Sequence, residues 1–109
     1  MNRNEISRVD EVLLQHKIFP NKKGYGYLKG VILTLSRDKN ATLKSAYAEI
    51  AKVKDVKISA VEKGISNVIE KSFESFTIAE KYGKAVNKEK GKLTNKQFIF
   101  TVLKVINHT

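Results

Sequence analysis

Two helical patterns, separated by only three residues, occupy the stretch from 47 to 73, and this stretch constrains the fold more than any other. The first pattern carries Tyr47, Ile50 and Ala51 and ends near Lys54. The second repeats apolar residues at the i, i+3, i+4, i+7 spacing of an amphipathic helix, at Ile58, Val61, Ile65, Val68, Ile69 and Phe73. Because so short a turn makes two helices cross steeply and share a core, the stretch predicts a helix-turn-helix.

The outward face of the helix expected at 58–73 is small and polar. It carries Ser59, Ala60, Glu62, Lys63, Ser66, Asn67 and Glu70. A helix of this kind fits the major groove of DNA and can present side chains to base edges. However, many two-helix turns bind nothing, and Lys54 occupies the eighth position of the unit, where an apolar residue is preferred. The pattern alone therefore leaves DNA binding and a purely structural role open.

The charge of the chain gives a second indication of a partner. Its 109 residues contain 21 lysines and arginines against 11 aspartates and glutamates, which gives a net charge of +10. Such an excess favours a polyanionic partner, most simply nucleic acid, although a basic protein without such a partner is the alternative. The length fits a single domain spanning 1–109.

Several classes of protein are disfavoured by what the sequence lacks. It has no cysteine, so disulfides, thiol catalysis and zinc–thiolate sites are excluded. No apolar run approaches the ~18 residues of a membrane span, and the N-terminus lacks the apolar segment of a signal peptide. No metal-ligand cluster or nucleophile–base pair can be assembled from the residue spacing. We therefore expect a cytoplasmic protein that is not an enzyme and has no cofactor, membrane contact or small-molecule substrate.

The residues before 38 predict two further helices. Residues 4–18 form the first, with Asn4 as N-cap and an apolar stripe of Ile6, Val9, Val12 and Leu13. His16 near its end is interpreted as a solvated residue or one that interacts with the helix dipole, rather than as a ligand. Residues 24–37 are ambiguous, because the run 31–35 has strand propensity and each glycine weakens a helix by roughly 1 kcal/mol. We predict a helix because Tyr25, Leu28, Ile32 and Leu35 keep helical spacing and no second strand could pair with the run. The glycines at 24, 26 and 30 then indicate close helix packing rather than a phosphate-binding loop.

The C-terminal third predicts a short helix, a basic loop and a last helix. The short helix covers 77–82, with Gly83 at its C′ position. The basic loop carries Lys84, Lys88, Lys90 and Lys92. Thr94 and Gln97 have the spacing of a capping box. The last helix that follows buries Phe98, Ile99, Val102, Leu103 and Ile106.

Several collinear segments together resemble one family, the C-terminal DNA-binding domain of the master response regulator of endospore formation. They are GYGYL at 24–28, YAEIA at 47–51, SAVEKGI at 59–65, VIE at 68–70, Phe73, Tyr82-Gly83 and KLTNKQFI at 92–99. The resemblance runs from about residue 6 to residue 106. It implies an all-α domain of about six helices with a central helix-turn-helix at helices three and four, and a winged-helix-like basic loop without a sheet.

The resemblance also implies that the fourth helix, about 58–73, reads DNA. The positions matching base contacts hold Glu62, Lys63, Ser66 and Asn67. We expect backbone contacts from Lys57, Ser59, Lys88, Lys90, Lys92, Thr94 and Asn95. The family usually has arginine where Ser66 stands and a basic residue where Ala60 stands, and we expect a stand-alone chain without the family's receiver domain.

Three functions follow as hypotheses. The first is a sequence-specific transcription regulator that binds double-stranded DNA, with a homodimer on tandem sites as an option. The second is a protein-interaction module that pairs with or antagonises a full-length regulator, which the departures at Ala60 and Ser66 would favour. The third is a nonspecific or RNA-binding protein in which Tyr25, Tyr27 and Phe76 stack on bases.

Overall fold

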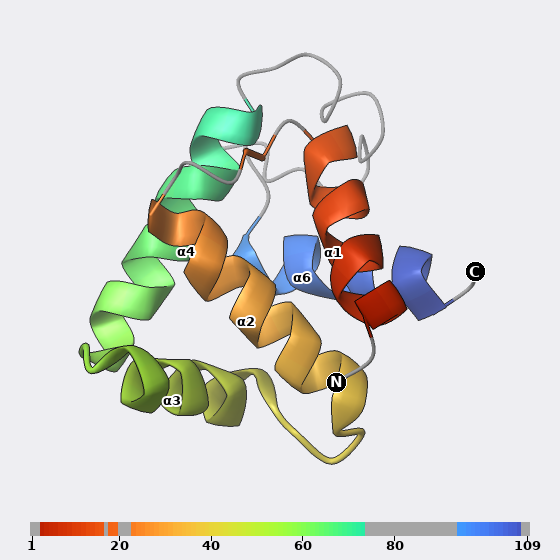
Figure 1. The fold of residues 1–109 in the computed structure, drawn as a ribbon. Helices are drawn as coiled ribbons and strands as arrows, with labels where there is room; N and C mark the ends of the chain where they lie inside the picture. The colour runs from red at the N-terminus through yellow and green to blue at the C-terminus, as the bar shows by residue number, and fades with distance from the viewer. Residues whose placement is uncertain (1–2, 17, 20–22, 74–93, 108–109) are drawn as a thin grey trace.

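The structure, a computed structural model, describes residues 3–16, 18–19, 23–73 and 94–107, and its elements there are five α-helices. They are α1 (Arg3–Gln15), α2 (Lys23–Arg37), α3 (Leu43–Lys54), α4 (Ile58–Phe73) and α6 (Asn95–Asn107) (Figure 1). No strand occurs in these ranges, so the all-α prediction is confirmed and residues 31–35 are helical. The short helix expected at 77–82 and the basic loop expected at 84–92 lie outside the described residues. None of the described helices is long and apolar enough to cross a bilayer.

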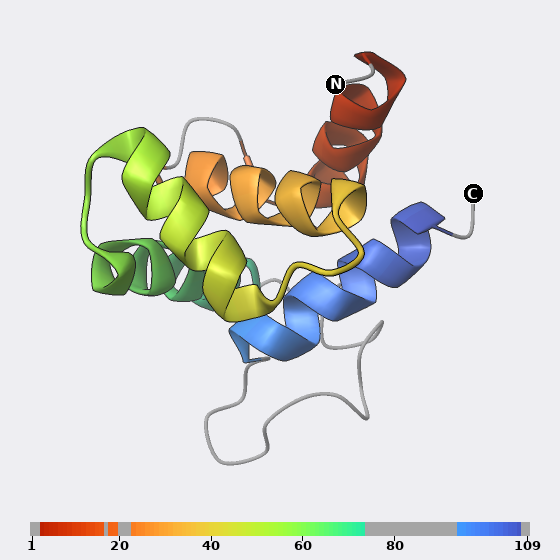
Figure 2. The same cartoon turned by 90° about the horizontal axis from the view of Figure 1, so that it is seen from below.

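Helix α2 is the centre of the packing. It contacts α1, α3, α4 and α6, and Figures 1 and 2 show it between α1 on one side and α3 and α4 on the other. The four residues predicted for its apolar stripe are all buried, and so are Tyr27, Val31 and Leu33. A helix that is buried on several sides loses the one-sided pattern of a surface helix. This explains why its sequence also had the character of a strand.

Close approach at glycine occurs at two of the three predicted positions. A Cβ on Gly24 would lie 2.2 Å from the Gly64 carbonyl oxygen, so α2 and α4 cross backbone to backbone there. A Cβ on Gly30 would lie 2.7 Å from Ile50 Cδ1 of α3. At Gly26 the nearest atom would be Lys54 Nζ, 4.0 Å away. The close-packing prediction is therefore confirmed for Gly24 and Gly30 and wrong for Gly26.

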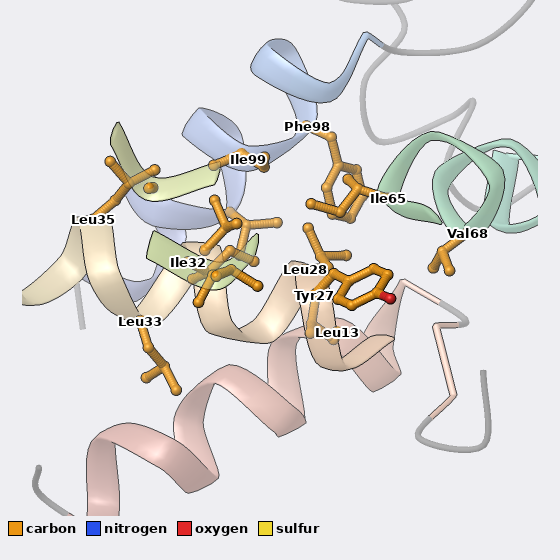
Figure 3. Close-up of a cluster of buried hydrophobic side chains, with 14 of the residues drawn as sticks. Leu13, Tyr27, Leu28, Ile32, Leu33, Leu35, Ile65, Val68, Phe98 and Ile99 are labelled. Carbon is orange, nitrogen blue, oxygen red and sulfur yellow. The ribbon is translucent and has the colours of Figure 1, made fainter. Parts of the chain in front are cut away.

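One hydrophobic core joins the described helices. Figure 3 shows Phe98 and Ile99 of α6 meeting Ile65 of α4 and side chains of α2 such as Leu28. The predicted stripe of α6 is buried as expected, with Ile106 partly buried at its edge. Helix α1 adds its own buried residues, Val9, Val12 and Leu13. The apolar periodicities thus identified the core face of α6, and that of α1 at these three positions; the side chain of Ile6 lies outside the described part of the chain.

The end of α1 differs from the prediction. The helix ends at Gln15, where the Ile18 amide donates to the Leu13 carbonyl oxygen at 3.0 Å and turns the chain inward. His16 is consequently only 2% exposed; its Nδ1 lies 2.7 Å from the Val12 carbonyl oxygen and its ring meets Phe98 edge-on. The solvated alternative for His16 is therefore wrong, whereas its contact with a carbonyl of the last helical turn agrees with the dipole alternative. The N-cap prediction for Asn4 is also wrong, because the helix already includes Arg3.

A polar contact links α1 to α2 at the edge of the core. The Tyr25 hydroxyl donates to Asp10 Oδ1, and Lys29 Nζ lies 2.9 Å from the same carboxylate. Burial alone raises the pKa of Asp10, but hydrogen bonds from Tyr25 and Lys29, together with the Lys29 charge, lower it below 3.8 overall. Asp10 is thus a charged acceptor that ties the two helices together.

Candidate nucleic-acid interface

The turn between α3 and α4 has the geometry predicted for a helix-turn-helix. Helix α3 starts at a capping box in which the Ser45 amide donates to Thr42 Oγ1 at 3.1 Å and the Thr42 amide donates to Ser45 Oγ at 2.9 Å. It ends at Lys54 and is capped by Asp55, which adopts the left-handed conformation with φ 55°. The Val56 amide then donates to the Ala51 carbonyl oxygen at 3.0 Å. These bonds satisfy carbonyl groups at the end of α3, and α4 begins three residues after Asp55.

The inner side of the unit packs largely as the periodicity predicted. Ala51 is 5% exposed, and Val61 and Ile65 are fully buried between α4 and the core. Ile58 is 41% exposed, so its assignment to the buried stripe is wrong. As the first residue of α4 it follows the turn directly, where the apolar contact with the core is made by the partly buried Val56 instead. The side chain of Phe73 lies outside the described part of the chain.

The outer side of α4 presents the predicted polar face. Ser59, Ala60, Glu62, Lys63, Asn67 and Glu70 are exposed, and Ser66 is half-buried. Lys57, in the turn before the helix, is also exposed. In Figure 1 the inner side of α4 lies against α2, and the helix runs along the edge of the bundle. Lys63 and Asn67 therefore point away from the core, as expected.

The first turn of α6 lies against this helix. Asn95 Nδ2 donates to the Glu62 carbonyl oxygen at 3.1 Å, although the two residues are 33 positions apart. The capping box is present, because the Gln97 amide donates to Thr94 Oγ1 at 3.1 Å and the Thr94 amide donates to Gln97 Oε1 at 3.0 Å. The Thr94 amide is thus occupied within the box, whereas the amides of Asn95 and Lys96 lie outside it. The structure therefore brings Thr94 and Asn95 beside the predicted base-reading residues.

Tyr47 connects this junction to α3, a role that the sequence interpretation missed. Tyr47 is 6% exposed, and the side chain of Asn95 lies close enough to its hydroxyl to affect its pKa. Burial raises the pKa of Tyr47, and the Glu62 charge adds to this effect, whereas the neighbouring Asn95 side chain acts in the opposite direction. The phenol therefore stays protonated near neutral pH. The available signal was that a buried tyrosine hydroxyl normally needs a polar partner.

The predicted contacts of the basic loop cannot be placed in the structure, and the predicted base-stacking role of the aromatic residues is not supported by it. Lys88, Lys90 and Lys92 lie outside the described residues, and so does Phe76. Tyr25 and Tyr27 are each 6% exposed, so neither ring is available to stack on a base. Within the described ranges, no group of three His, Cys, Asp or Glu side chains could hold a metal ion.

Comparison with known protein families gives a match. A family model described as "Sporulation initiation factor Spo0A C terminal" matches residues 9–106. The search of curated proteins found no match, and neither did the search of solved structures. The matched range includes the helix-turn-helix and the Thr94–Gln97 capping box.

Proposed function

Since the chain belongs to the family of the C-terminal domain of the sporulation initiation factor Spo0A, we propose that it regulates transcription by binding specific sequences in double-stranded DNA. Helix α4 enters the major groove, which admits one α-helix and displays a different pattern of donors and acceptors for each base pair. We further propose that residues 1–109 form one helix-turn-helix domain that acts in the cytoplasm. The observation that carries the proposal is the exposed polar face of α4 beside the first turn of α6.

The base-reading roles follow from the chemistry of each side chain. Lys63 donates to guanine O6 or N7, and Asn67 can pair with adenine through N6 and N7. Glu62 accepts from the cytosine N4 amino group, and the Ser66 hydroxyl can bond to several bases. Their places on successive turns of α4 allow them to address neighbouring base pairs.

The backbone contacts flank this face on two sides. Lys57 and Ser59 lie at the start of α4, where positive charge and helix amides meet a phosphate. Thr94 and Asn95 begin α6, and the amides of Asn95 and Lys96 can point at a second phosphate. Lys88, Lys90 and Lys92 add positive charge in the segment that precedes α6. A net charge of +10 supports this arrangement, because phosphate neutralisation dominates the affinity of proteins for DNA.

Selection of bound sequences from random duplex DNA at a stated salt concentration tests the proposal. An enriched motif supports sequence-specific binding, and uniform enrichment of all sequences would instead indicate nonspecific binding. If no duplex is retained, the proposal is wrong and the protein-interaction module becomes the better explanation. Sedimentation of the protein on duplexes with one and two copies of the motif would show whether it binds tandem sites as a homodimer.

Lys63→Ala and Asn67→Ala then test the reading face. Each should weaken binding to the selected duplex by about 1–3 kcal/mol and relax the preference at particular base pairs. The matched controls are Lys104→Ala and Asn40→Ala, which make the same replacements at exposed positions on α6 and in the turn before α3. Equal losses on selected and scrambled duplexes would reassign Lys63 and Asn67 to backbone contact.

A further inference from the structure

Asn95 makes a contact that a phosphate-binding residue does not need. Its Nδ2 donates to the main-chain carbonyl oxygen of Glu62 at 3.1 Å, inside the base-reading stretch of α4. A carbonyl oxygen has two lone pairs, so Glu62 can accept this bond in addition to its helical one. The side chain of Asn95 is therefore directed at the backbone of the neighbouring helix.

The same side chain reaches a third helix. The Asn95 side chain also lies beside the hydroxyl of Tyr47 in α3, where it affects the pKa of that group. Tyr47 is 6% exposed and belongs to the core. The Asn95 amide thus joins the first turn of α6 to the second turn of α4 and lies next to a core residue of α3.

We propose that Asn95 is a positioning residue, whose side chain holds α4 at the angle and depth needed to discriminate between base pairs. The inference rests on the function proposed above. In it the Asn95 side chain orients α4 and does not contact a DNA phosphate. Recognition side chains must be held within about 0.5 Å of the productive geometry, and second contacts behind them provide this precision. A bond to the Glu62 backbone acts on the whole helix and not on one side chain.

The two roles predict different binding data. Loss of a phosphate contact weakens binding to all sequences about equally, because phosphates carry no sequence information. Loss of a positioning contact weakens binding to the preferred sequence and leaves nonspecific binding nearly unchanged. Tyr47→Phe separates them further, because it removes the hydroxyl beside Asn95 without altering the ring.

The experiment compares full-length wild type with Asn95→Ala, Tyr47→Phe and the double variant. Dissociation constants are measured at fixed salt on the duplex that the wild type selects and on a scrambled duplex of the same composition. Asn95→Ala should weaken binding to the selected duplex by about threefold to tenfold, the scale of one hydrogen bond. Binding to the scrambled duplex should change by less than about twofold, as should both affinities of the control Asn40→Ala.

Tyr47→Phe should also reduce the ratio of the affinity for the selected duplex to that for the scrambled duplex. The double variant should lose less binding free energy on the selected duplex than the sum of the two single losses. Equal losses on both duplexes would overturn the proposal and make Asn95 a phosphate contact. An unchanged ratio for both single variants would also overturn it. If Asn95→Ala fails to fold, Tyr47→Phe and Asn95→Ser carry the same comparison. A wild type that selects no duplex would overturn the proposed function itself, whereas a wild type whose selectivity survives the substitutions overturns only the positioning role.

Discussion

Replacing Gly24 by alanine should destabilise the protein, because α2 and α4 cross at this residue without room for a side chain. The added Cβ would lie 2.2 Å from the Gly64 carbonyl oxygen and 2.3 Å from Val68 Cγ2. An ordinary Cβ contact is 3.4–4 Å. Val68 could change rotamer, but the carbonyl oxygen is held within α4, so the two helices would have to separate.

The magnitude follows from two opposing terms. Overpacking of a filled interface typically costs about 1–3 kcal/mol. Alanine gains at most about 0.5–1 kcal/mol over glycine inside a helix, and less at the second residue of one. We therefore expect Gly24→Ala to lower the free energy of unfolding by about 1–3 kcal/mol, with the clash dominating.

Gly26→Ala is the matched control, since it makes the same replacement two residues later in the same helix. Its Cβ would meet only Lys54 Nζ at 4.0 Å, the mobile end of a long side chain. The helix-propensity gain then stands alone, and we expect a stabilisation of about 0.5–1 kcal/mol.

Urea unfolding followed by far-UV circular dichroism measures both variants against the wild type. An unchanged dependence on urea would show that each substitution alters stability and not the extent of the folded structure. If Gly24→Ala and Gly26→Ala were equally stable, α2 and α4 could not cross backbone to backbone at Gly24, and the reasoning would be refuted.

Two further predictions concern charge. Because the pKa of Asp10 is lowered in the folded state, its stabilising effect is present above about pH 4 and is lost as the pH falls below that value. Asp10→Asn should be less stable by about 1 kcal/mol at neutral pH, because it loses the charged acceptor for Tyr25 and Lys29. The loss is no larger because the carboxylate is partly exposed to solvent. Thermal unfolding from about pH 5 to pH 2 should show a smaller further loss for Asp10→Asn than for wild type, and parallel curves would contradict the assignment. Lys90→Ala and Lys92→Ala should each lower affinity about uniformly on selected and scrambled duplexes and reduce the salt slope by roughly one unit. An unchanged slope for both would place this segment away from the DNA.

The amino-acid sequence by itself determined which of the described segments are helical, the capping box of α6 and the polar face of α4. These features depend on residues within about four positions of one another. The Thr94–Gln97 capping box and the buried pair Val61 and Ile65 could therefore be predicted from spacing alone. The resemblance to the sporulation-regulator family rested on such short collinear segments, and the family match over 9–106 confirms it.

Only the tertiary structure decided which of these elements meet. Periodicity made residues 47–73 the apparent centre of the chain, yet α2 contacts each of the other four described helices. The contact of His16 with Phe98 and the bond from Asn95 to Glu62 join elements distant in sequence, which no local pattern specifies. Gly24 and Gly26 illustrate the physical reason. They are the same residue type in the same helix, but two positions rotate a side chain by about 200° around the axis. One therefore faces the backbone of α4 and the other faces the end of the Lys54 side chain, and only the packing of the helices distinguishes them.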